Sequence, residues 1–327
     1  MITPGERPVR LCVTRRLPAA VESYLAEHYD AVFNPSDVPM SRAALHAAMV
    51  EYDALVPTIT DRLDADLIAT EGRRVRIFAN FGAGLDHVDL AAARTHGVVV
   101  TNTPGALTEA TAEAAVLLML MAARRASEGE RELRAGLWTG WRPTHLIGQS
   151  LAGRTLGLIG FGRIAQRTAA KARGLGMAIR YFSRNAASPE IEAALGATRA
   201  PSLEALAAEA DIVSLHVPGG PDTRHLVDRA FLAHVKPTAI LINTARGSVV
   251  DEDALAAALA EGRLAAAGLD VYEHEPAVHP GLLASSRAVL LPHLGSATVE
   301  ARAAMGMQAA ANLDAFFAGI EPPDRVA

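Results

Sequence analysis

The sequence predicts an α/β protein with two doubly wound domains, each built on a parallel sheet. Strand-like apolar runs alternate with helix-like stretches along almost the whole chain, as they do where crossover helices join parallel strands. A chain of 327 residues also exceeds what one hydrophobic core usually supports. The strand pattern restarts at Arg154, immediately before a glycine-rich turn, and this restart indicates where the second sheet begins.

The first domain is expected to contain four short strands, with helices such as residues 19–28 and 42–50 between them. The strands are residues 9–13, 54–56, 76–79 and 98–100. Six more strands are expected from residue 154 onward, which suits a dinucleotide-binding domain: TLGLIG, AIRYF, DIVSLH, AILIN, AAGLDV and AVLL. A long alanine-rich helix, residues 299–318, follows the last strand and can pack on either domain.

Composition argues against several classes of protein. A net charge of -5 and a pI near 6.1 give no electrostatic reason to expect a nucleic acid or membrane partner. The longest apolar run, residues 114–123, is shorter than the about 20 residues that cross a bilayer, and the opening MITPGERPVR carries no secretory pattern. The single Cys12 is expected to be a core residue in a reducing compartment. We therefore expect a cytoplasmic protein without a metal site.

The glycine turn at residues 157–165, GLIGFGRIA, is the strongest single motif. It follows a strand and opens a helix, which is the context that a dinucleotide fingerprint requires. Gly160 permits the tight turn, and Gly162 lets the backbone approach a pyrophosphate at the helix N-terminus. Ala165 stands where a third glycine is usual. The alternative is a glycine turn that only joins the strand to the helix.

The end of the next strand bears on the choice of nicotinamide cofactor. NAD-binding sites place an acidic residue there, whereas this chain has Ser183 and Arg184. Arg184 can pair with a 2′-phosphate, and Ser183 can donate a further hydrogen bond. We expect NADP(H) to be preferred and NAD(H) to be possible, unless Arg184 is only a solvated loop residue.

Three polar residues follow three successive strands of the second domain. Arg246, Glu275 and His293 should meet at the carboxyl edge of the sheet, where ligands of doubly wound domains bind. An arginine can clamp a carboxylate and a histidine can pass a proton near neutral pH. Together they predict hydride transfer to a 2-keto acid, with His293 as the proton donor. Glu273 and His274 compete with Glu275 for the role beside the histidine; the alternative for these two residues is a solvated pair.

Three blocks of the second domain resemble the D-isomer-specific 2-hydroxyacid dehydrogenase family. They are residues 243–251 (NTARGSVVD), 268–276 (GLDVYEHEP) and 291–298 (LPHLGSAT). The resemblance implies a Rossmann domain in which Arg246 binds substrate, Glu275 orients the histidine and His293 donates the proton. It also implies further cofactor-binding residues: Arg163, Ile164, Val217, Thr244, Ala245, Asp270 and Gly295. Asp270 would hold the nicotinamide carboxamide, although a plain turn residue is an alternative.

The first domain joins this resemblance at residues 80–89, NFGAGLDHVD. The family's substrate loop lies there, which places Ala83 and Gly84 against the substrate carboxylate, unless the segment is a plain glycine turn. The implied organisation is a discontinuous, flavodoxin-like substrate domain of residues 1–103 and 298–327. Residues 104–297 would then form the dinucleotide-binding domain, with hinge motion at the two crossings.

Residues 138–148, WTGWRPTHLIG, resemble the glyoxylate and hydroxypyruvate reductase branch of that family. There the segment belongs to a dimerisation arm, around residues 125–150 here, and Trp141 would reach the partner's substrate site. A bulky aromatic in an ordinary dimer contact is the alternative.

The leading hypothesis is a homodimeric, NADPH-dependent glyoxylate or hydroxypyruvate reductase acting on a small 2-keto or 2-hydroxy acid. The alternatives are 3-phosphoglycerate dehydrogenase, another NAD(P)-dependent D-2-hydroxyacid dehydrogenase, and a dinucleotide-sensing protein similar to corepressors.

Overall fold

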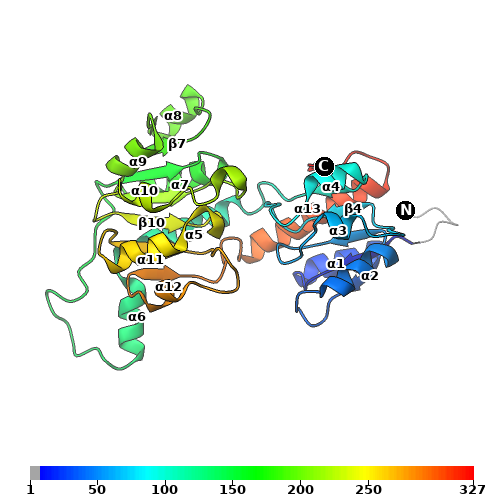
Figure 1. The fold of residues 1–327 in the computed structure, drawn as a ribbon, viewed down its shortest axis with the longest axis horizontal. Coiled ribbons are helices and arrows are strands. Elements are labelled where there is room, and N and C mark those ends of the chain that lie inside the picture. The colour runs from blue at the N-terminus through cyan, green and yellow to red at the C-terminus, as the bar shows by residue number, and fades with distance from the viewer. Residues whose placement is uncertain (1–7) are drawn as a thin grey trace. The chain divides into compact units, whose positions relative to one another are not determined.

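A computed structural model describes residues 8–327 of the chain (Figure 1). The expectation of no secretory pattern falls mainly on residues 1–7, which lie outside the described residues. The described chain divides into two compact units. One runs up to Leu107 and also contains Ala297–Ala327, and the other is Thr108–Ser296.

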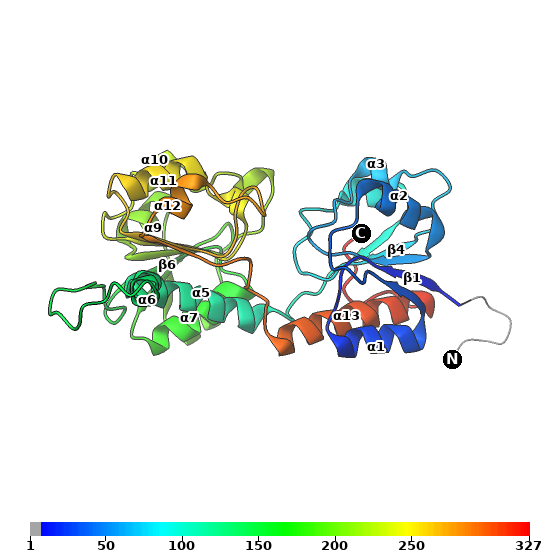
Figure 2. The same ribbon diagram turned by 90° about the horizontal axis from the view of Figure 1, so that it is seen from below.

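The first unit is a five-stranded parallel sheet with helices on both faces. Its strand order is β2-β1-β3-β4-β5, and every pairing is parallel. Helices α1 and α13 cover one face, and α2 and α3 lie on the other (Figure 2). The elements are β1 (Arg10–Val13), α1 (Ala19–His28), β2 (Asp30–Phe33), α2 (Arg42–Glu51), β3 (Ala54–Val56), α3 (Ala65–Ile68), β4 (Ile77–Ala79), α4 (Leu90–Thr95), β5 (Val99–Thr101) and α13 (Val299–Phe317).

The second unit is a seven-stranded parallel sheet in the order β12-β11-β10-β9-β6-β7-β8. Its elements are α5 (Thr108–Ala123), α6 (Ala126–Arg134), β6 (Thr155–Ile159), α7 (Arg163–Gly174), β7 (Ala178–Phe182), α8 (Pro189–Leu195), β8 (Ala197–Arg199), α9 (Leu203–Glu209), β9 (Ile212–Leu215), η1 (Pro221–Thr223), α10 (Arg229–Leu232), β10 (Ile240–Asn243), η2 (Gly247–Val249), α11 (Glu252–Ala260), β11 (Ala266–Leu269), α12 (Pro280–Ala284) and β12 (Ala288–Leu290). The prediction of two doubly wound parallel sheets is therefore confirmed.

The strand count from the sequence was wrong by one in each unit. Both missed strands, β2 and β8, lie at the edge of their sheets. Side chains of β2 alternate between exposed and half-buried, and two of the three in β8 are exposed. Neither strand presents the continuous apolar run that marks a buried parallel strand.

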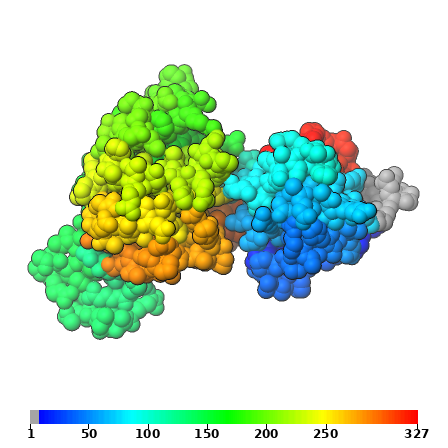
Figure 3. Space-filling view, viewed as in Figure 1, coloured from blue at the N-terminus to red at the C-terminus, as the bar shows by residue number. Residues whose placement is uncertain are grey.

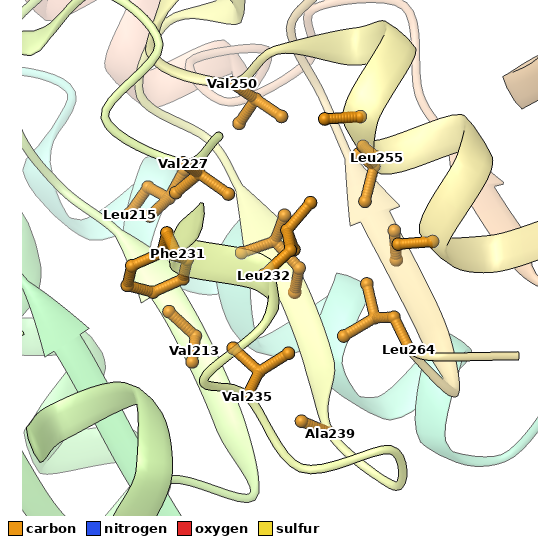
Figure 4. Close-up of a cluster of buried hydrophobic side chains, with 14 of the residues drawn as sticks. Val213, Leu215, Val227, Phe231, Leu232, Val235, Ala239, Val250, Leu255 and Leu264 are labelled. Carbon is orange, nitrogen blue, oxygen red and sulfur yellow. The ribbon is translucent and has the colours of Figure 1, made fainter. Parts of the chain in front are cut away.

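Two hydrophobic cores cover the two faces of the larger sheet. One core packs α9 to α12 against the strands, and Figure 4 shows Phe231, Leu232 and Leu255 among its side chains. On the other face, the apolar helix α5 lies beside the small face of α7, where Ala165, Ala169 and Ala172 are fully buried. These small side chains let α7 approach the sheet closely, which fixes the position of its first turn.

Cys12 lies in the core of the first unit, as expected. Its side chain is 4% exposed, and burial raises the pKa of the thiol to about 12. Among residues 8–327, no helix combines the length and apolar character needed to cross a membrane.

Helices α1 and α13 of the first unit meet at a glycine. A methyl group on Gly306 would lie 2.4 Å from Val21 Cγ2 and 2.7 Å from its Cγ1. Val21 is fully buried, so its side chain has no room to move aside. We expect Gly306→Ala to lower the free energy of unfolding by about 1–3 kcal/mol, the usual cost of overpacking, as measured by urea denaturation.

The double variant Val21→Ala/Gly306→Ala provides the control for this contact. It should be more stable than the sum of the two single changes predicts, because the smaller side chain accepts the new methyl group. Simple additivity of the two changes would show that these side chains do not clash.

Candidate active site

The two glycines of the turn between β6 and α7 are needed for different reasons. Gly160 has φ of +86°, and a Cβ there would lie 2.4 Å from the carbonyl oxygen of His216, at the end of β9. Only glycine fits this turn. A Cβ on Gly162 would meet no protein atom within 4 Å. Gly162 therefore leaves open space in front of α7.

The start of α7 has the properties of an anion-binding site. Gly162 is its N-cap and supplies no side-chain hydrogen bond, so the first amides of the helix, beginning with Arg163 and Ile164, keep their N–H groups available. Nearby strand ends place Val217 and Thr244 on the same edge of the sheet. The Thr244 hydroxyl is buried and has no hydrogen-bond partner among the described residues. Open space and an orphaned hydroxyl both fit a bound dinucleotide.

A second arginine, Arg199, adds positive charge at the end of β7. The Arg184 side chain is 87% exposed, and its one ion-pair contact among residues 8–327 is to Asp222 at 3.9 Å. The Ser183 hydroxyl donates to Asn185 O at 2.6 Å. Arg199, at the end of the unpredicted strand β8, donates from Nη2 to the carbonyl oxygens of Ser183 (2.8 Å) and Arg184 (3.2 Å).

Sheet register places the three candidate catalytic segments at equal depth. Asn243, Leu269 and Leu290 are aligned across β10, β11 and β12. Three residues beyond these aligned positions lie Arg246, Tyr272 and His293 respectively. The loops that contain them therefore leave the sheet side by side.

Glu275 and His293 are in direct contact. Glu275 Oε2 lies 2.9 Å from His293 Nδ1, and Oε1 accepts a 3.0 Å hydrogen bond from the Tyr272 amide. Burial raises the pKa of Glu275, but the hydrogen bond and charge of His293, the Tyr272 amide and the charge of Arg246 together lower it below the ordinary value. Glu275 is therefore ionised at neutral pH, and only Nε2 of the imidazole remains to meet a ligand.

The loops after β10 and β11 touch through their backbones. A Cβ on Gly247 would lie 1.8 Å from the carbonyl carbon of Tyr272, so no other residue fits beside Arg246. The Asn243 amide also donates to Arg246 O at 2.8 Å. These contacts fix the backbone at Arg246 relative to the loop that carries Glu275.

Asp270 holds the backbone around His293. Its two carboxylate oxygens accept hydrogen bonds from the amides of Leu294 (2.6 Å) and Gly295 (2.7 Å), and its carbonyl oxygen accepts from His293 N. His293 has φ of +55°, the left-handed region that side chains other than glycine seldom adopt. Burial raises the pKa of Asp270 despite these amide contacts.

Competing residues near the site have other partners. Glu273 is not half of a solvated pair with His274: its carboxylate lies 2.7 Å from Arg224 and 2.8 Å from His225, and its side chain is 11% exposed. Its amide donates to the buried Glu252. His216, directly after β9, is half-buried, and burial lowers the pKa of its imidazole to about 3, so the ring is neutral at neutral pH.

In the first unit, the loop at residues 80–87 turns its carbonyl groups inward. The buried side chain of Asn80 donates to the carbonyl oxygens of Gly82 and Gly84, and Asn102 donates to that of Ala83. His87 Nε2 lies 2.9 Å from Asn80 Oδ1. The amides of Ala83 and Gly84 have no hydrogen-bond acceptor in the described part of the chain. Sequence reasoning missed Asn80 and Asn102, because nothing in a loop motif shows which way its carbonyls point.

The predicted arm stands out from its own unit. Helix α6 and the residues after it form a separate lobe (Figure 3), and Trp141 is 83% exposed. Other large apolar side chains of the lobe are also exposed: Leu133, Leu137, Trp138 and Ile147. No group of three or more potential metal ligands lies together among residues 8–327.

Comparison with known proteins identifies the family. Residues 116–295 match the family described as "D-isomer specific 2-hydroxyacid dehydrogenase, NAD binding domain". The chain is 42% identical to a protein named glyoxylate reductase from Thermococcus litoralis, over 97% of this chain and 96% of the relative. It is 46% identical to one of the same name from Aeropyrum pernix, over 98% and 96% respectively.

A solved structure agrees with these matches. It is an NADPH-dependent glyoxylate/hydroxypyruvate reductase from Sinorhizobium meliloti in complex with NADP and malonate, with a TM-score of 0.86 and 36% identity. The similarity covers 98% of this chain and 97% of that one. The chain therefore belongs to the D-isomer specific 2-hydroxyacid dehydrogenase family, as its sequence motifs predicted, and its larger unit contains the NAD-binding domain of that family.

Proposed function

We propose that this protein reduces a small 2-keto acid, glyoxylate or hydroxypyruvate, to the 2-hydroxy acid with NADPH. The observation that carries this proposal is the contact between Glu275 and His293 at the sheet edge that also holds Arg246 and the glycine turn. The names of the relatives support the choice of substrate.

In this proposal residues 104–297 form the dinucleotide-binding domain, and residues 1–103 with 298–327 bind the substrate. The amides after Gly160 and Gly162, at Arg163 and Ile164, would hold the pyrophosphate. When bound, the reduced nicotinamide supplies the hydride. The cofactor would be lined by Val217, Thr244, Ala245, Asp270 and Gly295. Asp270 would hold the carboxamide. Each of its carboxylate oxygens already accepts one backbone amide, and either could accept the carboxamide N–H as a second bond.

The substrate carboxylate is assigned to two kinds of donor. The guanidinium of Arg246 can form two parallel hydrogen bonds with it. The amides of Ala83 and Gly84 are a second set of donors. The side chains of Asn80 and Asn102 bind the carbonyl oxygens of that loop and so hold its backbone in place. Holding the carboxylate would orient the keto group for reduction.

The proton comes from His293 in this mechanism. Glu275 occupies Nδ1, which leaves the Nε2 proton to be donated to the carbonyl oxygen as hydride reaches the carbon. The negative charge of Glu275 stabilises the imidazolium before transfer. Arg246 polarises the same carbonyl through its positive charge.

The cofactor preference and the assembly are also part of the proposal. Arg184 favours the 2′-phosphate of NADP(H) over NAD(H), and Ser183 would add a hydrogen bond once its hydroxyl turns from Asn185 O to the phosphate. The end of β7 offers no carboxylate for a ribose 2′-hydroxyl. We further propose a cytoplasmic homodimer formed through the arm, with Trp141 narrowing the partner's substrate site. The exposed apolar side chains of the arm favour burial in such an interface.

The decisive assay follows NADPH absorbance with a panel of short 2-keto acids. We expect turnover with glyoxylate and hydroxypyruvate, and a higher kcat/KM with NADPH than with NADH. No turnover of any keto acid with either cofactor would contradict the enzymatic proposal. Turnover with a preference for NADH would contradict only the assignment of Ser183 and Arg184.

The proton donor is tested with His293→Ala. We expect kcat for glyoxylate to fall about a hundredfold or more, the usual scale for a general acid, while the Kd for NADPH stays unchanged in fluorescence titration. His234→Ala is the matched control, because this exposed histidine lies in the same unit beyond α10. Equal kcat in the two variants would remove His293 from the mechanism.

The Glu275 carboxylate is tested through the pH dependence. Its pKa is lowered in the folded protein, so it is charged throughout the neutral range and stabilises the imidazolium. In Glu275→Gln this stabilisation is absent, and the fall of kcat/KM for reduction with rising pH should begin at a lower pH than in the wild type. An unchanged pH profile would show that the carboxylate does not act on His293.

A further inference from the structure

Arg199 lies at an unusual position in the larger sheet. It ends the edge strand β8, where it is paired in register with Tyr181 of β7. Its Nη2 atom donates to the carbonyl oxygens of Ser183 and Arg184. A guanidinium has five N–H donors, and these two contacts use only one of its nitrogens. Within residues 8–327, neither Nε nor Nη1 of Arg199 has a hydrogen-bond or ion-pair partner.

The charge around this loop is poorly compensated. No carboxylate lies within ion-pair distance of Arg199 in the described chain, and Arg184 has only Asp222 at 3.9 Å, with both side chains almost fully exposed. Other arginines of the same sheet have partners. Arg180 on β7 binds Glu209 at 2.7 Å, and Arg154 before β6 binds Asp211 at 3.5 Å.

We propose that Arg199 is a specificity-determining residue that, with Arg184, binds the 2′-phosphate of NADP(H). This inference rests on the proposed preference for NADP(H) and deepens it. A phosphomonoester carries close to two negative charges at neutral pH, so two guanidinium groups match it better than one. The contacts of Nη2 hold the Arg199 head against the loop that follows β7, and Nε and Nη1 remain to face the ligand.

The contacts of Nη2 are compatible with two roles for Arg199. If it only ties down the carbonyls of the loop, its loss should weaken every ligand that uses the loop. If it binds phosphate, its loss should weaken only ligands that carry the 2′-phosphate. The pair 2′,5′-ADP and 5′-AMP separates these roles, because the two molecules differ only in the 2′-phosphate.

The experiment measures the binding of both nucleotides to the full-length protein by calorimetry. For Arg199→Gln we expect the Kd of 2′,5′-ADP to rise about tenfold, the scale of a lost charge-assisted hydrogen bond, with the Kd of 5′-AMP unchanged. Arg199→Lys keeps the charge but not the forked donors, so its Kd for 2′,5′-ADP should lie between those of the wild type and Arg199→Gln. In the enzyme assay, Arg199→Gln should raise KM for NADPH and leave KM for NADH unchanged.

Arg173→Gln is the matched control. Arg173 also donates to a backbone carbonyl, that of Ala194 at 2.6 Å, but it lies in the last turn of α7, away from the end of β7. It should leave both affinities unchanged. If Arg199→Gln lowered the affinity for both nucleotides equally, or for neither, the inference would be overturned. Equal affinity of the wild type for the two nucleotides would instead contradict the NADP(H) preference. The proposed reduction of keto acids would still stand, because its own assay is turnover.

Discussion

The parallel order of β9, β10, β11 and β12 is the constraint on which the candidate site depends. Because every strand runs the same way, their carboxyl ends share one edge, and residues far apart in the sequence leave the sheet together. Two hydrophobic cores, one on each face of the sheet, hold these strands together. The fold therefore places Arg246 and His293, and local contacts only adjust them.

The most important of these adjustments is made by Asp270. A left-handed backbone at a residue such as His293 costs about 1–3 kcal/mol, and three backbone amides that donate to Asp270 hold the segment there. In return, the imidazole meets Glu275 through Nδ1 and keeps Nε2 for a ligand. Gly295 serves the same contact, since a Cβ there would lie 3.1 Å from Asp270 Oδ2.

The sequence was informative wherever a local pattern has a physical cause. Apolar runs predicted the buried strands, and the glycine spacing predicted the turn at Gly160, because a tight turn against β9 admits no side chain. It failed where the cause is not local. The edge strand β8 has no apolar pattern, so Arg199 was missed with it. Glu273 contacts His225, which lies 48 residues earlier in the sequence, and no spacing rule predicts that contact.

The charge of the His293–Glu275 pair changes during the proposed reaction, and this change affects product release. A protonated His293 and an ionised Glu275 together carry no net charge, whereas after proton donation the pair is negative. In the proposed reaction the product still carries its carboxylate. After proton donation the negatively charged pair would therefore repel the product. The side chains of His293 and Glu275 are 30% and 33% exposed, which gives solvent a route to return the proton once the product has left. The ion pair that supplies the proton would therefore also favour release of the hydroxy acid.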